Sequence, residues 1–505
     1  MKSKELKIGS LLSYSGVFVN IVISLFLSPF TVRMLGQAQF GLYQLIWSFV
    51  GYMGVLDFGF SNTLIRYIAK YHSEGKQEEE QRFLGMSFII YGAISALILI
   101  AGTLLYSNLS RIFPALSPSE ILLAKKLFII MVCNFILNIF LNVFPAVINA
   151  YERFIFIRST ALIRTLIRTG VVVAALLAGG QSLAIAWIDT AFSLFFFALY
   201  AWFVRFRLHT RIRFGRLDWG MLREVFGFSF FVFLVVLVDQ INWKVDQLIL
   251  GVKRTVSEVA VYSIAMQFPT YLMSFGTSIS GVFLPKATQM EARGEKGEAF
   301  TDLMVRTARV EWTVLGAILL GFALFGREFI LLWLGEGFLV AYPIALMVMA
   351  ALAIPMLQSV GILIQQAKNM HRFRAVVYLS IAVANIFLSV WLVDRIGMIG
   401  AAIGTVFSFV VGNVLFMNLY YHFKMGINIP HFFIQTAKGL LPATCILIGC
   451  GLLMNLLPGT TWFRLALKVA VFLLLYIAII FFVGQNRQEK EMYLELIHFV
   501  RRNPK

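Results

Sequence analysis

The chain has 505 residues, of which 60% are hydrophobic and only 13% are charged, and its mean hydropathy is +0.83. A soluble globular protein carries about 25% charged residues, so this composition excludes a soluble enzyme or a soluble binding domain. The formal net charge of +18 would fit a nucleic-acid-binding protein. However, the basic residues stand at the ends of apolar runs, where a membrane protein needs them, so we expect no nucleic acid partner.

Apolar runs separated by short loops follow one another along the whole chain. Each run is long enough to cross about 30 Å of hydrocarbon as a helix. The sequence therefore predicts an all-α polytopic membrane protein with about fourteen transmembrane helices, and no loop is large enough for a catalytic domain. The predicted spans are residues 8–32, 40–67, 83–107, 121–149, 157–178, 181–204, 224–250, 257–283, 303–326, 341–366, 375–394, 397–421, 436–456 and 462–483.

The basic residues alternate between the two sides of the predicted membrane. When Lys2, Lys4 and Lys7 are placed in the cytoplasm, about 30 of the 43 basic residues fall on that side, helix ends included. This asymmetry predicts that both termini are cytoplasmic. Topology alone explains such residues, and contact with anionic lipid headgroups is the alternative.

Two halves of the chain resemble each other. The segment RMLGQAQFGLYQL follows the first span and LILGVKRTVSEVAVYSI follows the seventh, at an offset of about 215 positions. We therefore expect two six-helix lobes related by a pseudo-twofold axis along the membrane normal, with the substrate cavity between them. The predicted domains are an N-lobe (1–204), an arginine-rich cytoplasmic linker (205–223), a C-lobe (224–425), two further helices (430–484) and an amphipathic cytoplasmic tail (485–505).

Two arginines lie deep in the fifth span, where a charge costs about 2.5–3.5 kcal/mol and needs a reason. Arg164 and Arg168 are one helical turn apart, and two guanidinium groups on one face suit a phosphate or diphosphate. Because this span has no acid of its own, we expect a wet anion site without a fixed counter-ion. The structural alternative is an ion pair with Asp57, Asp189 or another acid.

The seventh span is unusually polar and adds a third deep cation, Lys244, which is a further candidate for the diphosphate site. Alternatively, Lys244 pairs with aspartates of the same span, permanently or as a switch that opens during transport. The deep acids are the candidates for coupling to a proton or Na⁺ gradient, or to the membrane potential, and otherwise for ion pairing. These acids are Asp57, Asp189, Asp239 and Asp246.

Amide side chains line one face of the fourth span, and such a stripe can hydrogen-bond sugar hydroxyls in a wet cavity or join helices. We favour the cavity, because four asparagines exceed what helix association requires. The stripe consists of Asn134, Asn138, Asn142 and Asn149, and Gln267 and Gln358 are weaker candidates in later spans. The sequence lacks a phosphate-binding loop motif, metal-ligand spacing and a nucleophile–histidine–acid set, so we expect neither cofactor, metal nor enzymatic activity.

The segment LGQAQFGLYQLIWSFVGYMGVLDFGFSNTLIRYIAKY, together with NAYERFIFI and GVFLPKATQM, resembles the Wzx-type polysaccharide flippases of the multidrug/oligosaccharidyl-lipid/polysaccharide exporter superfamily. The resemblance implies a two-lobe, V-shaped fold in a bacterial plasma membrane. It implies that alternating access moves an undecaprenyl-diphosphate-linked oligosaccharide to the outer leaflet, for O-antigen, capsule or exopolysaccharide synthesis. The implied partners are this substrate, membrane lipids, and the polymerase and glycosyltransferases of the pathway.

Two other functions are weighed against the flippase. An organic-cation antiporter of the same superfamily would need an acidic cavity, whereas Arg164, Arg168 and Lys244 make this one cationic. A membrane glycan polymerase or ligase would be expected to carry a large external loop with catalytic arginine or histidine, and every predicted outer loop is short. The sequence therefore favours the flippase.

Overall fold

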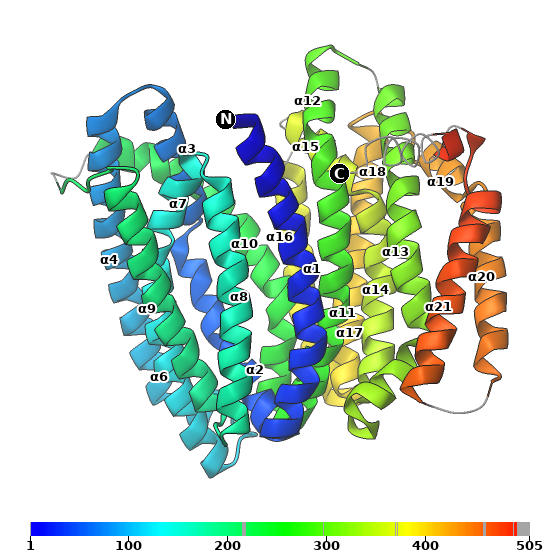
Figure 1. Cartoon of the computed structure of the whole chain (residues 1–505), viewed down its shortest axis with the longest axis horizontal. Helices are drawn as coiled ribbons and strands as arrows, with labels where there is room; N and C mark the ends of the chain where they lie inside the picture. Colours follow the sequence, from blue (N-terminus) through cyan, green and yellow to red (C-terminus); the bar gives the residue numbers. More distant parts are fainter. Residues whose placement is uncertain are drawn as a thin grey trace. The chain divides into compact units, whose positions relative to one another are not determined.

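The computed structural model describes residues 2–214, 219–295, 297–368, 370, 372–457, 461–487 and 489–491. Parts of the predicted linker (205–223) and most of the predicted tail (485–505) therefore lie outside the described residues. The described part of the chain consists of helices, turns and loops without a strand (Figure 1). The all-α membrane fold predicted from the sequence is thus confirmed.

The chain divides into two compact units, Met1–Ser263 with Ala382–Gly404, and Ile264–Ile381 with Thr405–Lys505. The predicted lobe boundaries and their symmetry axis stay predictions. The helices of the first unit are α1 (Lys2–Leu35), α2 (Gln37–Gly51), η1 (Tyr52–Asp57), α3 (Phe60–Ser73), α4 (Gln77–Ser107), α5 (Leu109–Ile112), α6 (Pro118–Leu141), α7 (Val143–Ala150), α8 (Phe154–Leu177), α9 (Ser182–Phe206) and α10 (Trp219–Lys253). Three helices contribute to both units, namely α11 (Val256–Ser280), α16 (Arg372–Ile396) and α17 (Met398–Ser408).

The second unit is also helical and contains two π-helical segments. Its helices are η2 (Gly281–Phe283), α12 (Leu284–Ala292), α13 (Gly297–Leu334), η3 (Glu336–Phe338), α14 (Ala341–Leu357), α15 (Ser359–Ala367), the π-helix η4 (Phe409–Phe416), α18 (Met417–Phe423), α19 (Ile429–Ala437), α20 (Leu440–Asn455), α21 (Trp462–Ile479) and the π-helix η5 (Ile480–Gly484). The long helix α13 packs against α14, α19, α20 and α21.

Ten helices of the described residues are long and apolar enough to cross a membrane, or up to eleven if the bent pair α19 and α20 forms one span. The predicted count of fourteen therefore stays a prediction. The predicted span 40–67 is broken, because Phe58 and Gly59 both adopt left-handed backbone conformations between η1 and α3. Gly59 has no Cβ and takes this conformation at little cost, so a glycine stands at the break.

In the first unit, α9 packs against both α6 and α8, and these three helices position the polar side chains of the candidate site. Helix α6 contacts α9, α9 contacts α8, and α8 packs along α1 (Figure 1). Helix α6 begins with a capping box, in which Ser117 and Glu120 satisfy each other's backbone amides. Regular helices then carry Asn138, Arg164 and Asp189 at fixed positions on facing surfaces.

Candidate functional site

Arg168 of α8 forms an ion pair with Asp189 of α9. Its Nε and Nη2 atoms both donate to the carboxylate, with Nη2 3.0 Å from Oδ2, in the bidentate geometry that guanidinium groups prefer. The Tyr43 hydroxyl of α2 donates to the same carboxylate at 3.3 Å. The expectation that both arginines lack a fixed counter-ion was therefore wrong for Arg168, and Asp189 is the acid of the structural alternative.

Arg164, one turn earlier on α8, has a different environment. Its Nη2 atom donates to the Ser193 hydroxyl at 3.3 Å, and its guanidinium lies 5.4 Å from the centre of the Phe196 ring. Among the described residues, no carboxylate forms a salt bridge with it. Two arginines that look equivalent in the sequence thus differ, because Arg168 is paired with a carboxylate, whereas Arg164 forms no salt bridge with the described residues.

Ser193 joins Arg164 to the asparagines of α6. The Asn138 amide donates to the Ser193 hydroxyl at 3.3 Å, and also to the Asn134 side-chain oxygen at 2.6 Å. The structure therefore brings together two predicted sugar-facing amides and one predicted phosphate-binding arginine. Ser193 itself was missed in the sequence, although its place one turn after Asp189 on the same helix could have indicated it.

The four asparagines of the predicted stripe lie on one helical span, Pro118–Ala150. Asn142 stands between α6 and α7, but its backbone keeps right-handed helical dihedral angles and its amide donates to the carbonyl of Asn138 at 3.0 Å. Asn142 is exposed, and Asn149 is half-buried near the end of α7. Of the four asparagines, Asn134 and Asn138 join the arginine cluster by hydrogen bonds.

Lys244 is half-buried on α10. Its Nζ atom packs closely against Gly51, because a Cβ atom added to Gly51 would lie only 2.3 Å from it. No ion pair or hydrogen bond joins Lys244 to another residue in the described part of the chain. The alternative of a fixed pair with an aspartate of the same helix is thus not what the structure shows. Asp246 is buried and accepts a hydrogen bond from the Tyr262 hydroxyl at 2.6 Å, and Asp239 is exposed.

Asp57 ends η1 and accepts hydrogen bonds from the backbone amide and the hydroxyl of Ser61, both at 3.2 Å. The Ser61 hydroxyl is in turn 3.1 Å from that of Tyr91. Asp57 also borders a cavity of about 230 Å³ whose other lining residues are apolar. Within the described ranges it has no basic partner, and the N-terminus of α3 stabilises its negative charge.

The two predicted glutamines belong to the second unit. Gln358 is buried at the end of α14 and donates to Asn418 at 2.6 Å, while Gln267 of α11 accepts from the Tyr271 hydroxyl at 3.0 Å. The cluster on α6, α8 and α9 belongs to the first unit and does not include them. That cluster offers a guanidinium that forms no salt bridge with the described residues, together with hydroxyl and amide groups, and this combination suits an anion that also carries hydroxyls.

Known proteins are similar to this chain in sequence and in fold. A family model described as polysaccharide biosynthesis protein matches residues 7–291, which is more than half of the chain. The chain belongs to this family. The resemblance to polysaccharide flippases inferred from the sequence is thereby confirmed, and the chain is a multi-pass membrane protein of that family.

Two similar proteins and one solved structure illustrate the similarity in sequence and in fold. The chain is 24% identical over 449 residues to the uncharacterized membrane protein EpsK of Bacillus subtilis, covering 84% of each protein. It is 27% identical over 177 residues to a protein of Haloferax volcanii named "probable low-salt glycan biosynthesis flippase Agl15". This match covers 34% of this chain and 36% of Agl15. A structure of the lipid II flippase MurJ in an inward closed conformation superposes with a TM-score of 0.73 at 17% identity, covering 96% of this chain and 99% of MurJ, which shows a shared fold.

Proposed function

We propose that this protein is a flippase that moves an undecaprenyl-diphosphate-linked oligosaccharide from the cytoplasmic to the outer leaflet of a bacterial plasma membrane, by alternating access. The observation that carries the proposal is Arg164, a deep guanidinium without a carboxylate partner among the described residues, next to Ser193 and Asn138. Membership of a polysaccharide biosynthesis family and the names of the similar proteins support a glycan substrate on a lipid carrier.

The cationic and amide side chains of the candidate site have different expected roles. A half-buried cation deep in a span is costly without an anionic partner, so Arg164 and Lys244 are expected to recruit an anion from the substrate. The diphosphate provides that charge and accepts the two parallel hydrogen bonds of a guanidinium. Asn134 and Asn138 would then bind sugar hydroxyls beside it. Arg168, held by Asp189, positions the helices and is not free to bind the diphosphate.

The proposal is tested by complementing a flippase-null strain and by measuring flipping in proteoliposomes. Arg164→Ala is expected to lower flipping about 10- to 100-fold, because one or two charge-assisted hydrogen bonds to the diphosphate are lost. Arg164→Lys keeps the charge but not the fork, so we expect a smaller loss. Arg158→Ala removes an exposed arginine from the beginning of the same helix and is the matched control. Full glycan export by Arg164→Ala/Lys244→Gln at normal abundance would refute the assignment.

Coupling to a proton or Na⁺ gradient is a further part of the proposal, and Asp57 is its candidate. This carboxylate has amide and hydroxyl donors but no ion pair within the described residues, and it borders a cavity. Asp57→Asn should therefore weaken the dependence of flipping on the ion gradient more than it weakens substrate binding. An unchanged ion dependence would leave Asp57 with a structural role, through its hydrogen bonds to Ser61 in the first turn of α3.

A further inference from the structure

A buried glutamate of the second unit, Glu311 of α13, takes no part in the proposed substrate site. Its side chain is 0% exposed and lies against the junction of α14 and α15, where the Ser359 hydroxyl donates to Oε1 at 2.8 Å. The other oxygen, Oε2, is buried and has no hydrogen-bond partner in the part of the chain that the structure describes. An ionised carboxylate at this place would therefore keep one oxygen without a donor, which is costly away from water.

The buried cations of the described residues serve other acids. Two basic side chains are buried there, namely Arg309 and Lys468. Arg309 donates to the Glu489 carboxylate at 2.9 Å, and Lys468 of α21 donates to Glu328 at 2.9 Å. Neither cation is left to neutralise Glu311.

The other elements that pack against α13 supply no counter-ion to Glu311 among the described residues. Helix α15 has no titratable side chain, and the Tyr476 hydroxyl of α21 donates to the backbone carbonyl of Trp312 at 2.9 Å. No hydrogen bond or salt bridge joins Glu311 to any titratable or charged group of these elements within the described ranges. Those groups are Glu336 of η3, Tyr342 of α14, His431 of α19, Cys445 and Cys450 of α20, and Arg464, Lys468 and Tyr476 of α21, with Tyr421 of α18 against Gly361 of α15.

The side of Glu311 towards the apolar stretch of α13 is tightly packed. Leu315 stands one turn further along the helix and meets α11 and α14. A Cβ atom added to Gly276 of α11 would lie 3.5 Å from Leu315 Cδ1 and 3.1 Å from Met356 Sδ. Close-packed apolar side chains leave no room for water, so solvent reaches Glu311 more easily from the charged end of α13.

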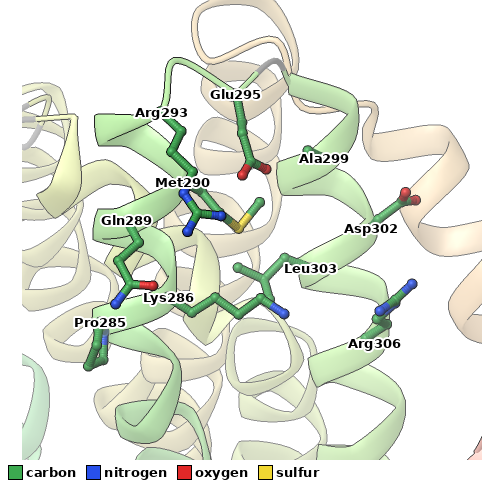
Figure 2. A pocket seen from close by; sticks show the side chains of 10 residues that line it. All are labelled: Pro285, Lys286, Gln289, Met290, Arg293, Glu295, Ala299, Asp302, Leu303 and Arg306. Carbon is green, nitrogen blue, oxygen red and sulfur yellow. The ribbon is translucent and has the colours of Figure 1, made fainter.

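The charged end of α13 borders an open hollow. Figure 2 shows this hollow, which has a volume of about 520 Å³, with Lys286 of α12 and Arg306 of α13 among its lining residues. Along α13, Arg306 stands about 7.5 Å before Glu311 at the helical rise of about 1.5 Å per residue.

A second buried polar side chain lies on α15, which packs against both α12 and α13. Gln365 is 0% exposed, and neither its Nε2 nor its Oε1 atom has a hydrogen-bond partner among the described residues. Buried polar groups without protein partners are commonly bonded to ordered water. Gln365 therefore fits a wet path from the hollow towards Glu311.

We propose that Glu311 is a proton-binding site of the second unit, which holds its proton in this conformation and exchanges it with solvent through the charged end of α13. A proton on Oε2 removes the negative charge without a counter-ion, and Oε1 still accepts the hydrogen bond from Ser359. A metal cation would need several oxygen ligands, whereas the described contacts supply this carboxylate and one hydroxyl. The role in transport rests on the proposed flippase function, and it adds a second acid to Asp57 of the first unit.

The test of the bound proton is infrared spectroscopy of the full-length protein in detergent at pH 7, in H2O and in D2O. A neutral carboxylic acid absorbs apart from a carboxylate and shifts when its proton is replaced by deuterium, whereas exposed acids are ionised at this pH. We expect Glu311→Gln to lose the neutral-acid band of one side chain. Glu298→Gln removes an exposed glutamate of the same helix, so this matched control should keep the band.

Three infrared results would overturn the proton site. The first is an equal neutral-acid band in the wild type and in Glu311→Gln, because Glu311 would then be ionised. The second is a band that does not shift in D2O, because the proton would then be closed off from solvent. The third is loss of the band when Na⁺ replaces K⁺ at constant ionic strength, because the site would then hold a metal cation.

The role in transport is tested by flipping of the lipid-linked oligosaccharide in proteoliposomes, with and without an imposed pH gradient. Glutamine resembles the neutral acid but cannot release a proton, so Glu311→Gln should lose the response to the gradient, whereas Glu298→Gln should keep it. Equal responses in the wild type and in Glu311→Gln would contradict a role of Glu311 in coupling. If the wild type does not flip this lipid at all, the proposed function fails, and the infrared result, which needs no substrate, still decides whether Glu311 binds a proton.

Discussion

The ion pair between Arg168 and Asp189 makes a sharp prediction about stability. Asp189 is 12% exposed and Arg168 is 30% exposed, so the pair is largely withdrawn from solvent. Asp189→Asn leaves a guanidinium with a neutral partner that can accept only one of its two hydrogen bonds. Breaking a buried pair from one side costs about 3–5 kcal/mol, and the partial exposure of Arg168 places our expectation near about 3 kcal/mol.

Removing both charges should cost much less than removing one. In Arg168→Met/Asp189→Leu no buried charge is left unpaired, so we expect a loss of about 1 kcal/mol or less. Tyr43→Phe removes only the 3.3 Å hydrogen bond to Asp189 and serves as the control for local disturbance, with an expected cost of about 1 kcal/mol.

The free energy of unfolding is measured in mixed detergent titrated with sodium dodecyl sulfate, for the wild type and the three variants. If Asp189→Asn costs less than about 1 kcal/mol, or the double variant costs as much as Asp189→Asn alone, the structural role of this pair is refuted. Flipping by the same variants then separates stability from transport, because the proposed substrate arginine, Arg164, is unchanged in all of them.

Three further predictions concern buried hydrogen bonds and a close backbone contact. Glu311 is fully buried in α13 and accepts a hydrogen bond from the Ser359 hydroxyl at 2.8 Å. Glu311→Gln keeps an acceptor for this hydrogen bond and should lower the free energy of unfolding by less than about 1 kcal/mol, whereas Glu311→Ala should lower it by about 2–3 kcal/mol in the same titration. Arg309 donates two hydrogen bonds to the Glu489 carboxylate, at 2.5 Å and 2.9 Å. It also donates to the backbone carbonyls of Gln435, Thr436, Lys438 and Gly484. Arg309→Ala should therefore lower the free energy of unfolding by about 3–5 kcal/mol, and a loss below about 1 kcal/mol would contradict a stabilising role for Arg309. A Cβ on Gly85 would lie 2.2 Å from the carbonyl oxygen of Arg213, so Gly85→Ala should displace the segment around Arg213 and make it cleave faster in limited proteolysis; an unchanged cleavage rate would show that the contact is dispensable.

The protein class and the residue types of the candidate site could be predicted from the sequence. Hydropathy and the placement of charges at helix ends are properties of each segment, so they can be read without knowing which segments touch. For the same reason the deep residues Arg164, Arg168 and Lys244 stood out, because a charge inside an apolar run is costly wherever its partner lies. The motif resemblance then indicated the family that the comparisons show.

Which of these charges are paired depends on how the helices pack, and the sequence did not predict it. Arg164 and Arg168 lie one turn apart on α8, and the packing of α9 sets Asp189 against one and Ser193 against the other. Likewise, the packing of α6 on α9 sets Asn138 against Ser193. The spacing of side chains along one helix shows which residues share a face. It does not show which helix packs against that face, and an ion pair between two helices depends on both.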